Sequence, residues 1–115
     1  MEGVCLINER FPVNGLSNEE STQLQLNHCL QFMRDKSIEV VPLNKQQIYP
    51  HYSIPHALLY DLSKSNRELD YLVIYSDRML QEFIHVYPAK WVMLKSFFRE
   101  VVVINKEQSI SINIH

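Results

Sequence analysis

Short runs of apolar residues, rich in valine and isoleucine, alternate along the chain with longer segments of helical periodicity. The runs occupy residues 4–7, 38–41, 70–75 and 101–104. Each run is too short for a helix, and β-branched runs of this length predict strands buried on both faces, as in a parallel sheet. We expect the run at 70–75 to be the central strand.

The segments between these runs carry helix signals. Ser17 and Glu20 have the spacing of a capping box, which opens the first helix. Pro55 suits the first turn of a second helix, because its fixed backbone angle is already helical. A third helical region spans residues 79–98, and Pro88 predicts a break or two successive helices within it.

The end of the chain has a different pattern. Residues 109–114 alternate polar and apolar side chains, which predicts a half-exposed, antiparallel edge strand. The full order of elements predicts an α/β fold with three layers (α/β/α) and right-handed crossovers. We expect a mostly parallel sheet of about five strands with an antiparallel edge strand. At 115 residues the chain forms a single domain, 1–115.

Composition limits the classes of function. Hydrophobic residues make up 46% of the chain and charged residues 21%, which is typical of a soluble globular domain. The net charge of −2 disfavours autonomous DNA or RNA binding, because stand-alone nucleic-acid binders are distinctly basic. No apolar run approaches the roughly 18 residues of a transmembrane helix, and no signal-peptide pattern is present. We therefore expect a cytoplasmic protein that does not engage membranes.

The cysteines and histidines form no recognisable metal or redox motif. Cys5 and Cys29 are isolated thiols of the kind usually buried as small hydrophobes. No histidine stands at metal-ligand spacing from a cysteine or a carboxylate. With only two glycines, the chain also lacks the glycine-rich turns of dinucleotide-binding domains and P-loops. The sequence predicts no metal and no cofactor.

Two polar segments follow predicted strands. Asn8-Glu9-Arg10 comes after the first strand, and Asp77-Arg78 comes after the central strand. Ligands of open α/β sheets bind at the carboxyl ends of strands, so we expect any site to lie near these residues. The structural alternative is that Asp77 caps the following helix and Arg78 lies in solvent. A phosphoacceptor receiver domain has the right size, but it would need an acidic cluster after the first strand.

Four segments of the chain match the motifs of one known family. Residues 14–20, Asn-Gly-Leu-Ser-Asn-Glu-Glu, are similar to a loop and helix start of the type Gly-x-Ser-x-x-x-Gln. Residues 38–41 match a strand often written Glu-Val-Val, and 54–62 match an Arg-Pro-Ala-Leu helix start. Residues 70–79 are similar to Asp-Val-Leu-Val-Val-Tyr-x-x-Asp-Arg-Leu-Ser-Arg. Together they resemble the catalytic domain of the serine recombinases (the resolvase/invertase family), over nearly the whole chain.

The resemblance also implies that most residues needed for recombination are replaced. It places Asn8 at the position of the serine nucleophile, and an asparagine amide cannot form the covalent link to DNA. Leu6 and Ile54 stand where the family has arginines, and Gln81 replaces the last arginine of the Asp-Arg-Leu-Ser-Arg motif. These arginines would stabilise charge in the transition state. The candidate vestigial site comprises Asn8, Asp77, Arg78 and Gln81, and no catalytic residue is assigned.

Two functions from different classes follow. The first is a non-catalytic resolvase-like domain that acts as a protein-interaction or regulatory module, binding a protein partner or itself, with weak or absent DNA binding in isolation. The alternative is a site-specific DNA recombinase catalytic domain or another DNA- or phosphate-handling enzyme. That alternative predicts that Asn8, Asp77 and Arg78 converge on a cleft with part of the long loop at 42–56. Exposure of aromatic residues in the 87–98 region would favour the first.

Overall fold

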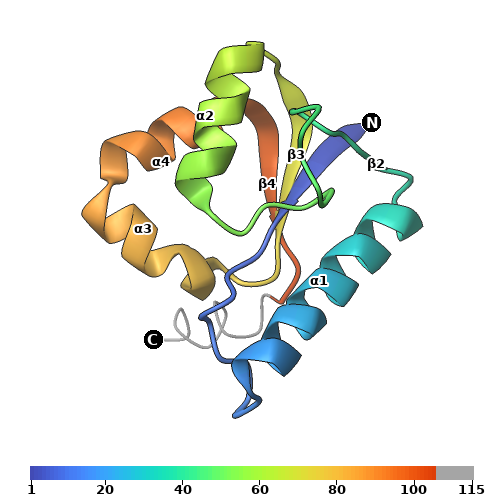
Figure 1. Ribbon diagram of the computed structural model, residues 1–115, viewed down its shortest axis with the longest axis vertical. Helices are drawn as coiled ribbons and strands as arrows, with labels where there is room; N and C mark the ends of the chain where they lie inside the picture. Colours follow the sequence, from blue (N-terminus) through green and yellow to red (C-terminus); the bar gives the residue numbers. More distant parts are fainter. Residues whose placement is uncertain (106–115) are drawn as a thin grey trace, which may run out of the picture.

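The computed structural model describes residues 1–105 and has an α/β fold built on a four-stranded sheet (Figure 1). Its strands are β1 (Glu2–Leu6), β2 (Glu39–Val40), β3 (Leu69–Ile74) and β4 (Phe98–Val103), in the spatial order β2-β1-β3-β4. All three pairs of neighbouring strands in this sheet are parallel. β3 lies between β1 and β4, which confirms that the run at 70–75 forms a central strand.

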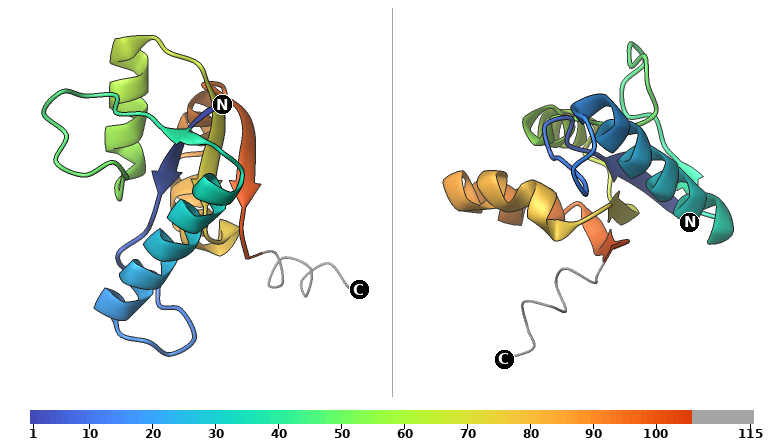
Figure 2. Two further views of the ribbon diagram at one scale, coloured as in Figure 1. Left: turned by 90° about the vertical axis from the view of Figure 1, so that its right-hand side faces the viewer. Right: turned by 90° about the horizontal axis from the view of Figure 1, so that it is seen from below.

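Helices cover both faces of this sheet. They are α1 (Asn18–Asp35), α2 (Pro55–Ser65), α3 (Gln81–Val86) and α4 (Pro88–Lys95), with a single 3₁₀ turn, η1 (Asp77–Leu80), before α3. Figures 1 and 2 show α1 on one face and α2, α3 and α4 on the other. Right-handed crossovers produce this distribution for the observed strand order. Among residues 1–105, no helix combines the length and the apolar character that crossing a membrane requires.

The start of α1 confirms the capping box that the sequence predicts. Ser17 Oγ accepts a hydrogen bond from the backbone N–H of Glu20 at 3.1 Å, and Glu20 Oε1 accepts one from the backbone N–H of Ser17 at 3.1 Å. Two amide groups that the helix leaves without partners are thereby satisfied. At the other end, Ser37 has a φ of 56°, and this left-handed residue turns the chain into β2.

The helical region after η1 is only partly as predicted. The break at Pro88 is confirmed, because α3 ends at Val86 and α4 begins at Pro88. The expectation that the helix continues to residue 98 is wrong, since α4 ends at Lys95 and Phe98 already belongs to β4. Phe98 pairs with Leu69 of β3 and is buried. Its apolar side chain fits helical spacing as well as a strand, so periodicity alone could not separate the two.

The sheet is narrower than the sequence predicts. Within residues 1–105 it has four strands rather than about five, and no pair is antiparallel. The predicted antiparallel strand at 109–114 lies outside the residues that the structure describes. The general prediction of an α/β fold with helices on both faces of a parallel sheet is confirmed.

The core lies between the sheet and its helices. Leu72, Val73 and Ile74 of β3 are almost fully buried, as expected for a strand covered on both faces. Cys5 and Cys29 are free thiols, buried between β1 and α1. A hydrogen-bonding contact with Cys29, together with burial, raises the pKa of the Cys5 thiol, so this group stays protonated.

Candidate functional site

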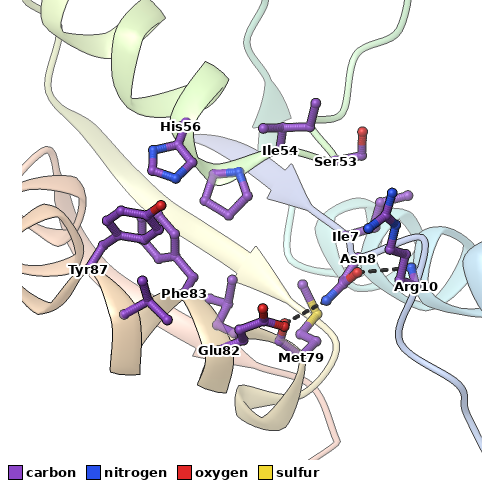
Figure 3. A pocket seen from close by; sticks show the side chains of 13 residues that line it. Ile7, Asn8, Arg10, Ser53, Ile54, His56, Met79, Glu82, Phe83 and Tyr87 are labelled. Carbon is purple, nitrogen blue, oxygen red and sulfur yellow. Dashed lines mark hydrogen bonds between the residues drawn. The ribbon is translucent and has the colours of Figure 1, made fainter.

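A cavity of about 400 Å³ opens at the carboxyl end of the sheet, where the ends of β1 and β3 meet the start of α2 (Figure 3). We call it the edge groove. Three segments line it: the exit of β1, the start of α2, and the η1–α3 region. Its lining residues are Ile7, Asn8, Arg10, Ser53, Ile54, Pro55, His56, Met79, Leu80, Glu82, Phe83, Val86 and Tyr87.

Asn8 joins two walls of the edge groove. Its side-chain Nδ2 donates a hydrogen bond to the carbonyl oxygen of Met79 at 2.8 Å, and its Oδ1 accepts one from the backbone N–H of Arg10 at 2.9 Å. Both ends of the side-chain amide are therefore in use. Asn8 acts as a brace between the exit of β1 and η1.

The backbone of Asn8 is held from the other side by Gln25 of α1, which is completely buried. Gln25 Oε1 accepts a hydrogen bond from the Asn8 N–H at 2.9 Å, and Gln25 Nε2 donates one to the Asn8 carbonyl at 2.8 Å. One turn earlier on α1, Ser21 Oγ accepts from the backbone N–H of Val13 at 2.9 Å. These contacts satisfy backbone groups of the loop after β1, which would otherwise be buried without partners.

The remaining residues of the sequence-based site lie beside the edge groove but do not line it. Asp77 and Arg78 begin η1, Gln81 begins α3, and all three residues are exposed. Ser76, rather than Asp77, supplies the side chain that caps η1, because its Oγ accepts from the backbone N–H of Arg78 at 3.2 Å. The structure thus brings Asn8 together with residues 53–56 of the long loop and leaves the other three outside.

One end of the edge groove is aromatic. The His56 ring meets the rings of Phe83 and Tyr87 edge to face, with centroids 5.1 and 4.6 Å apart, and the Phe83 and Tyr87 centroids are 5.8 Å apart. Beside this cluster, Ile54 and Val86 are more than half exposed, and Tyr87 is 41% exposed. Of the aromatic residues in the 87–98 region, Tyr87 is exposed, Trp91 and Phe97 are partly buried, and Phe98 is buried.

The other part of the edge groove is polar and charged. Figure 3 shows Arg10 on the β1 side and Glu82 on the α3 side, with Asn8 between them. Both charged side chains are exposed, and neither forms an ion pair within residues 1–105. The groove therefore presents one cation and one anion that no salt bridge in this part of the chain neutralises.

Tyr52 fixes the segment that delivers Ser53 and Ile54 to the edge groove. Its backbone N–H donates to the Cys5 carbonyl at 2.8 Å, and its carbonyl accepts from the Ile7 N–H at 2.8 Å. Its hydroxyl donates to Asp61 Oδ2 at 2.5 Å. Burial, and secondarily the hydrogen bond to Asp61, raises the pKa of the Tyr52 phenol. This wall of the groove is thus anchored to β1 and α2.

His51, directly before Tyr52, is a titratable residue in the same loop. Its ring stacks on Tyr49 at 5.3 Å, and its Nδ1 is buried without a hydrogen-bond partner among residues 1–105. Burial lowers the pKa of His51 from its ordinary value of 6.5, while the negative charge of Glu9 acts in the opposite direction. The folded loop favours the neutral imidazole.

Sequence reasoning missed Glu82 and Gln25 and gave Arg10 no role of its own. The usable signal for Gln25 was spacing, because the buried residues of α1 recur every four positions at Ser21, Gln25, Cys29 and Met33.

Within residues 1–105, no group of three or more histidine, cysteine, aspartate or glutamate side chains is placed to hold a metal ion. Comparisons with protein-family models, curated proteins and solved structures found no match for this chain.

Proposed function

We propose that this chain is a non-catalytic, resolvase-like domain that binds a protein partner, and that the edge groove receives an apolar segment of that partner. One observation carries the first half of the proposal. At the position that the resemblance gives to the serine nucleophile, Asn8 uses both ends of its side-chain amide to brace the fold. An amide in this role supplies neither a nucleophile nor a proton acceptor for phosphoryl transfer.

The neighbouring positions support the same proposal. Ile54, where the resemblance expects an arginine, lines the edge groove, and Leu6, where it expects another, is fully buried in β1. A transferred phosphoryl group needs several cations around it. Here one of the two positions presents an aliphatic side chain to the groove and the other is buried, so neither supplies a cation for a phosphate.

The shape and exposure of the edge groove favour a protein partner. Its volume of about 400 Å³ leaves room for a side chain that projects from a partner. Its rim exposes Ile54, Val86 and Tyr87 to solvent. Aromatic and aliphatic anchors of a partner commonly fill such pockets at the centre of a protein interface.

DNA or phosphate handling is the second candidate, because Arg10 and Arg78 are both exposed at this end of the sheet. Acidic side chains stand close to both arginines in the sequence, namely Glu9 and Asp77. Titration with single-stranded and duplex DNA at low and at physiological salt separates the two candidates. We expect no saturable binding, whereas a salt-dependent complex with duplex DNA would favour the second candidate.

Selection of peptides from a phage-displayed random heptapeptide library tests the main proposal. We expect the full chain to enrich peptides that bind it and that no longer bind the variant Val86→Asp. Val92→Asp is the matched control, since Val92 is also exposed and helical but lies outside the edge groove. Failure to enrich any peptide, or equal binding to Val86→Asp, would contradict the proposal.

A further inference from the structure

The edge groove is polarised along its length. The rings of His56, Phe83 and Tyr87 form one end, and Arg10 stands at the other (Figure 3). We infer that the partner segment carries a carboxylate next to a large apolar side chain, with the carboxylate on Arg10 and the apolar group at the aromatic end. This inference rests on the proposed function and names the chemistry of the partner.

Arg10 is suited to bind a carboxylate. Its backbone N–H donates to Asn8 Oδ1, which fixes the base of the side chain, while the guanidinium is exposed. No carboxylate within residues 1–105 forms an ion pair with it. A guanidinium presents a planar fork of donors that matches the two oxygens of a carboxylate.

Glu82 sets the direction in which the segment binds. It lies on the α3 side of the edge groove, across Asn8 from Arg10. A second carboxylate on that side would be repelled, whereas a cation or an N–H donor would be accepted. We therefore expect the acidic residue of the partner on the Arg10 side only.

The concave shape favours a protruding segment over a second copy of this surface. Two edge grooves facing each other would leave their cavities unfilled, and cavities at an interface forfeit packing contacts. A side chain that projects from a partner fills the cavity and covers Ile54, Val86 and Tyr87 at the rim. The occupant that fits is a convex peptide segment with one apolar anchor.

The test repeats the heptapeptide selection on the full chain and on Arg10→Glu. Arg78→Glu is the matched control, because Arg78 is an exposed arginine at the same end of the sheet that does not line the edge groove. We expect the unaltered chain and Arg78→Glu to enrich an acidic residue beside a large apolar one. Arg10→Glu should lose that acidic preference. An unchanged acidic preference on Arg10→Glu would overturn the inference.

A second measurement changes the peptide rather than the protein. One enriched peptide is synthesised with its acidic residue and with the isosteric amide (Asp→Asn or Glu→Gln), and both are titrated into the full chain. We expect the amide peptide to bind about fivefold more weakly, as for a partly exposed ion pair. On Arg10→Glu the acidic peptide should lose this advantage and bind no better, or more weakly, than the amide peptide, because two carboxylates would then face each other. Equal affinity of the two peptides for the unaltered chain would overturn the inference.

Loss of the carboxylate contact and loss of the binding site give different experimental results. If Val86→Asp abolishes peptide binding while the Asp→Asn change has no effect, the edge groove binds partners but does not read a carboxylate. If Val86→Asp leaves peptide binding intact, the proposed function itself fails. If the chain self-associates and Val86→Asp makes it monomeric, the occupant is a second copy and the inference is overturned.

Discussion

The side-chain amide of Asn8 donates a hydrogen bond to the carbonyl oxygen of Met79 at 2.8 Å, joining two residues 71 positions apart. This contact links the exit of β1 to η1, which follows the central strand. It places an asparagine, fully engaged in the fold, where the resemblance to serine recombinases expects a free nucleophile. Asn8 therefore holds the exit of β1 against η1 at the edge groove.

Asn8→Ala should destabilise the fold. The change removes the hydrogen bonds to Met79 and Arg10, and we expect the free energy of unfolding to fall by about 1–2 kcal/mol. Denaturant unfolding measures it. Asn27→Ala is the control, because Asn27 accepts a hydrogen bond from Gln23 on an exposed face of α1. This variant should change the free energy of unfolding by less than about 0.5 kcal/mol. Equal effects of the two variants would mean that Asn8 is not a brace.

Gln25→Leu should lower the free energy of unfolding more than Asn8→Ala does, although leucine is a better core residue by hydropathy. The substitution leaves the N–H and the carbonyl of Asn8 without their buried partner, and we expect a loss of about 2–3 kcal/mol. Gln31→Leu on the same helix is exposed and serves as the control. A neutral or stabilising effect of Gln25→Leu would show that the loop after β1 finds other partners.

Tyr52→Phe tests the anchor of the loop that forms one wall of the edge groove. Loss of the hydroxyl removes the hydrogen bond to Asp61 at 2.5 Å, and we expect a decrease in stability of about 1–2 kcal/mol. Tyr60→Phe removes the same hydroxyl from an exposed side chain of α2 and should be nearly neutral. Similar unfolding curves for Tyr52→Phe and Tyr60→Phe would contradict the assigned role.

His51 should make stability depend on pH below neutrality. The folded protein lowers the pKa of His51 from 6.5, so folding favours the neutral ring. The contribution of the neutral His51 ring to folding stability is complete above pH 6.5. It is lost as the pH falls through the lowered pKa of the folded protein. His51→Phe should reduce the loss of stability between neutral and mildly acidic pH. If this variant loses as much stability on acidification as the unaltered chain, another group is responsible.

The fold could be predicted because the strands carry a strong local signal. The apolar run at 70–75 is too short for a helix, and the structure places it at the centre of the sheet as β3. The capping box at Ser17 and the break at Pro88 are also local, since each depends on a few neighbouring residues. The sequence predicts a helix at Phe98, because the role of this residue in β4 depends on pairing with Leu69 across the sheet, which local spacing does not reveal.

The site was harder to predict than the fold. Asn8 was found because polar residues that follow a buried strand stand out, but its partner Met79 is apolar and bonds through its backbone. Gln25 is hard to find because a polar side chain of an amphipathic helix is expected on the exposed face. In the structure Gln25 is buried, since its amide bonds to the backbone of the loop after β1. The four-residue spacing of the buried positions places Gln25 on the inner face of α1, but it does not indicate which backbone groups the amide contacts.

The most direct test of the account is the affinity of one selected peptide for three proteins: the unaltered chain, Val86→Asp and Val92→Asp. Val86 lies at the rim of the edge groove, where a bound peptide would cover it, and burying the unpaired charge of Val86→Asp under the peptide is costly. We predict that Val86→Asp weakens binding by at least about tenfold, while Val92→Asp changes it by less than about twofold. Equal weakening by both variants, or by neither, would contradict the claim that the edge groove is a binding site for a protein partner.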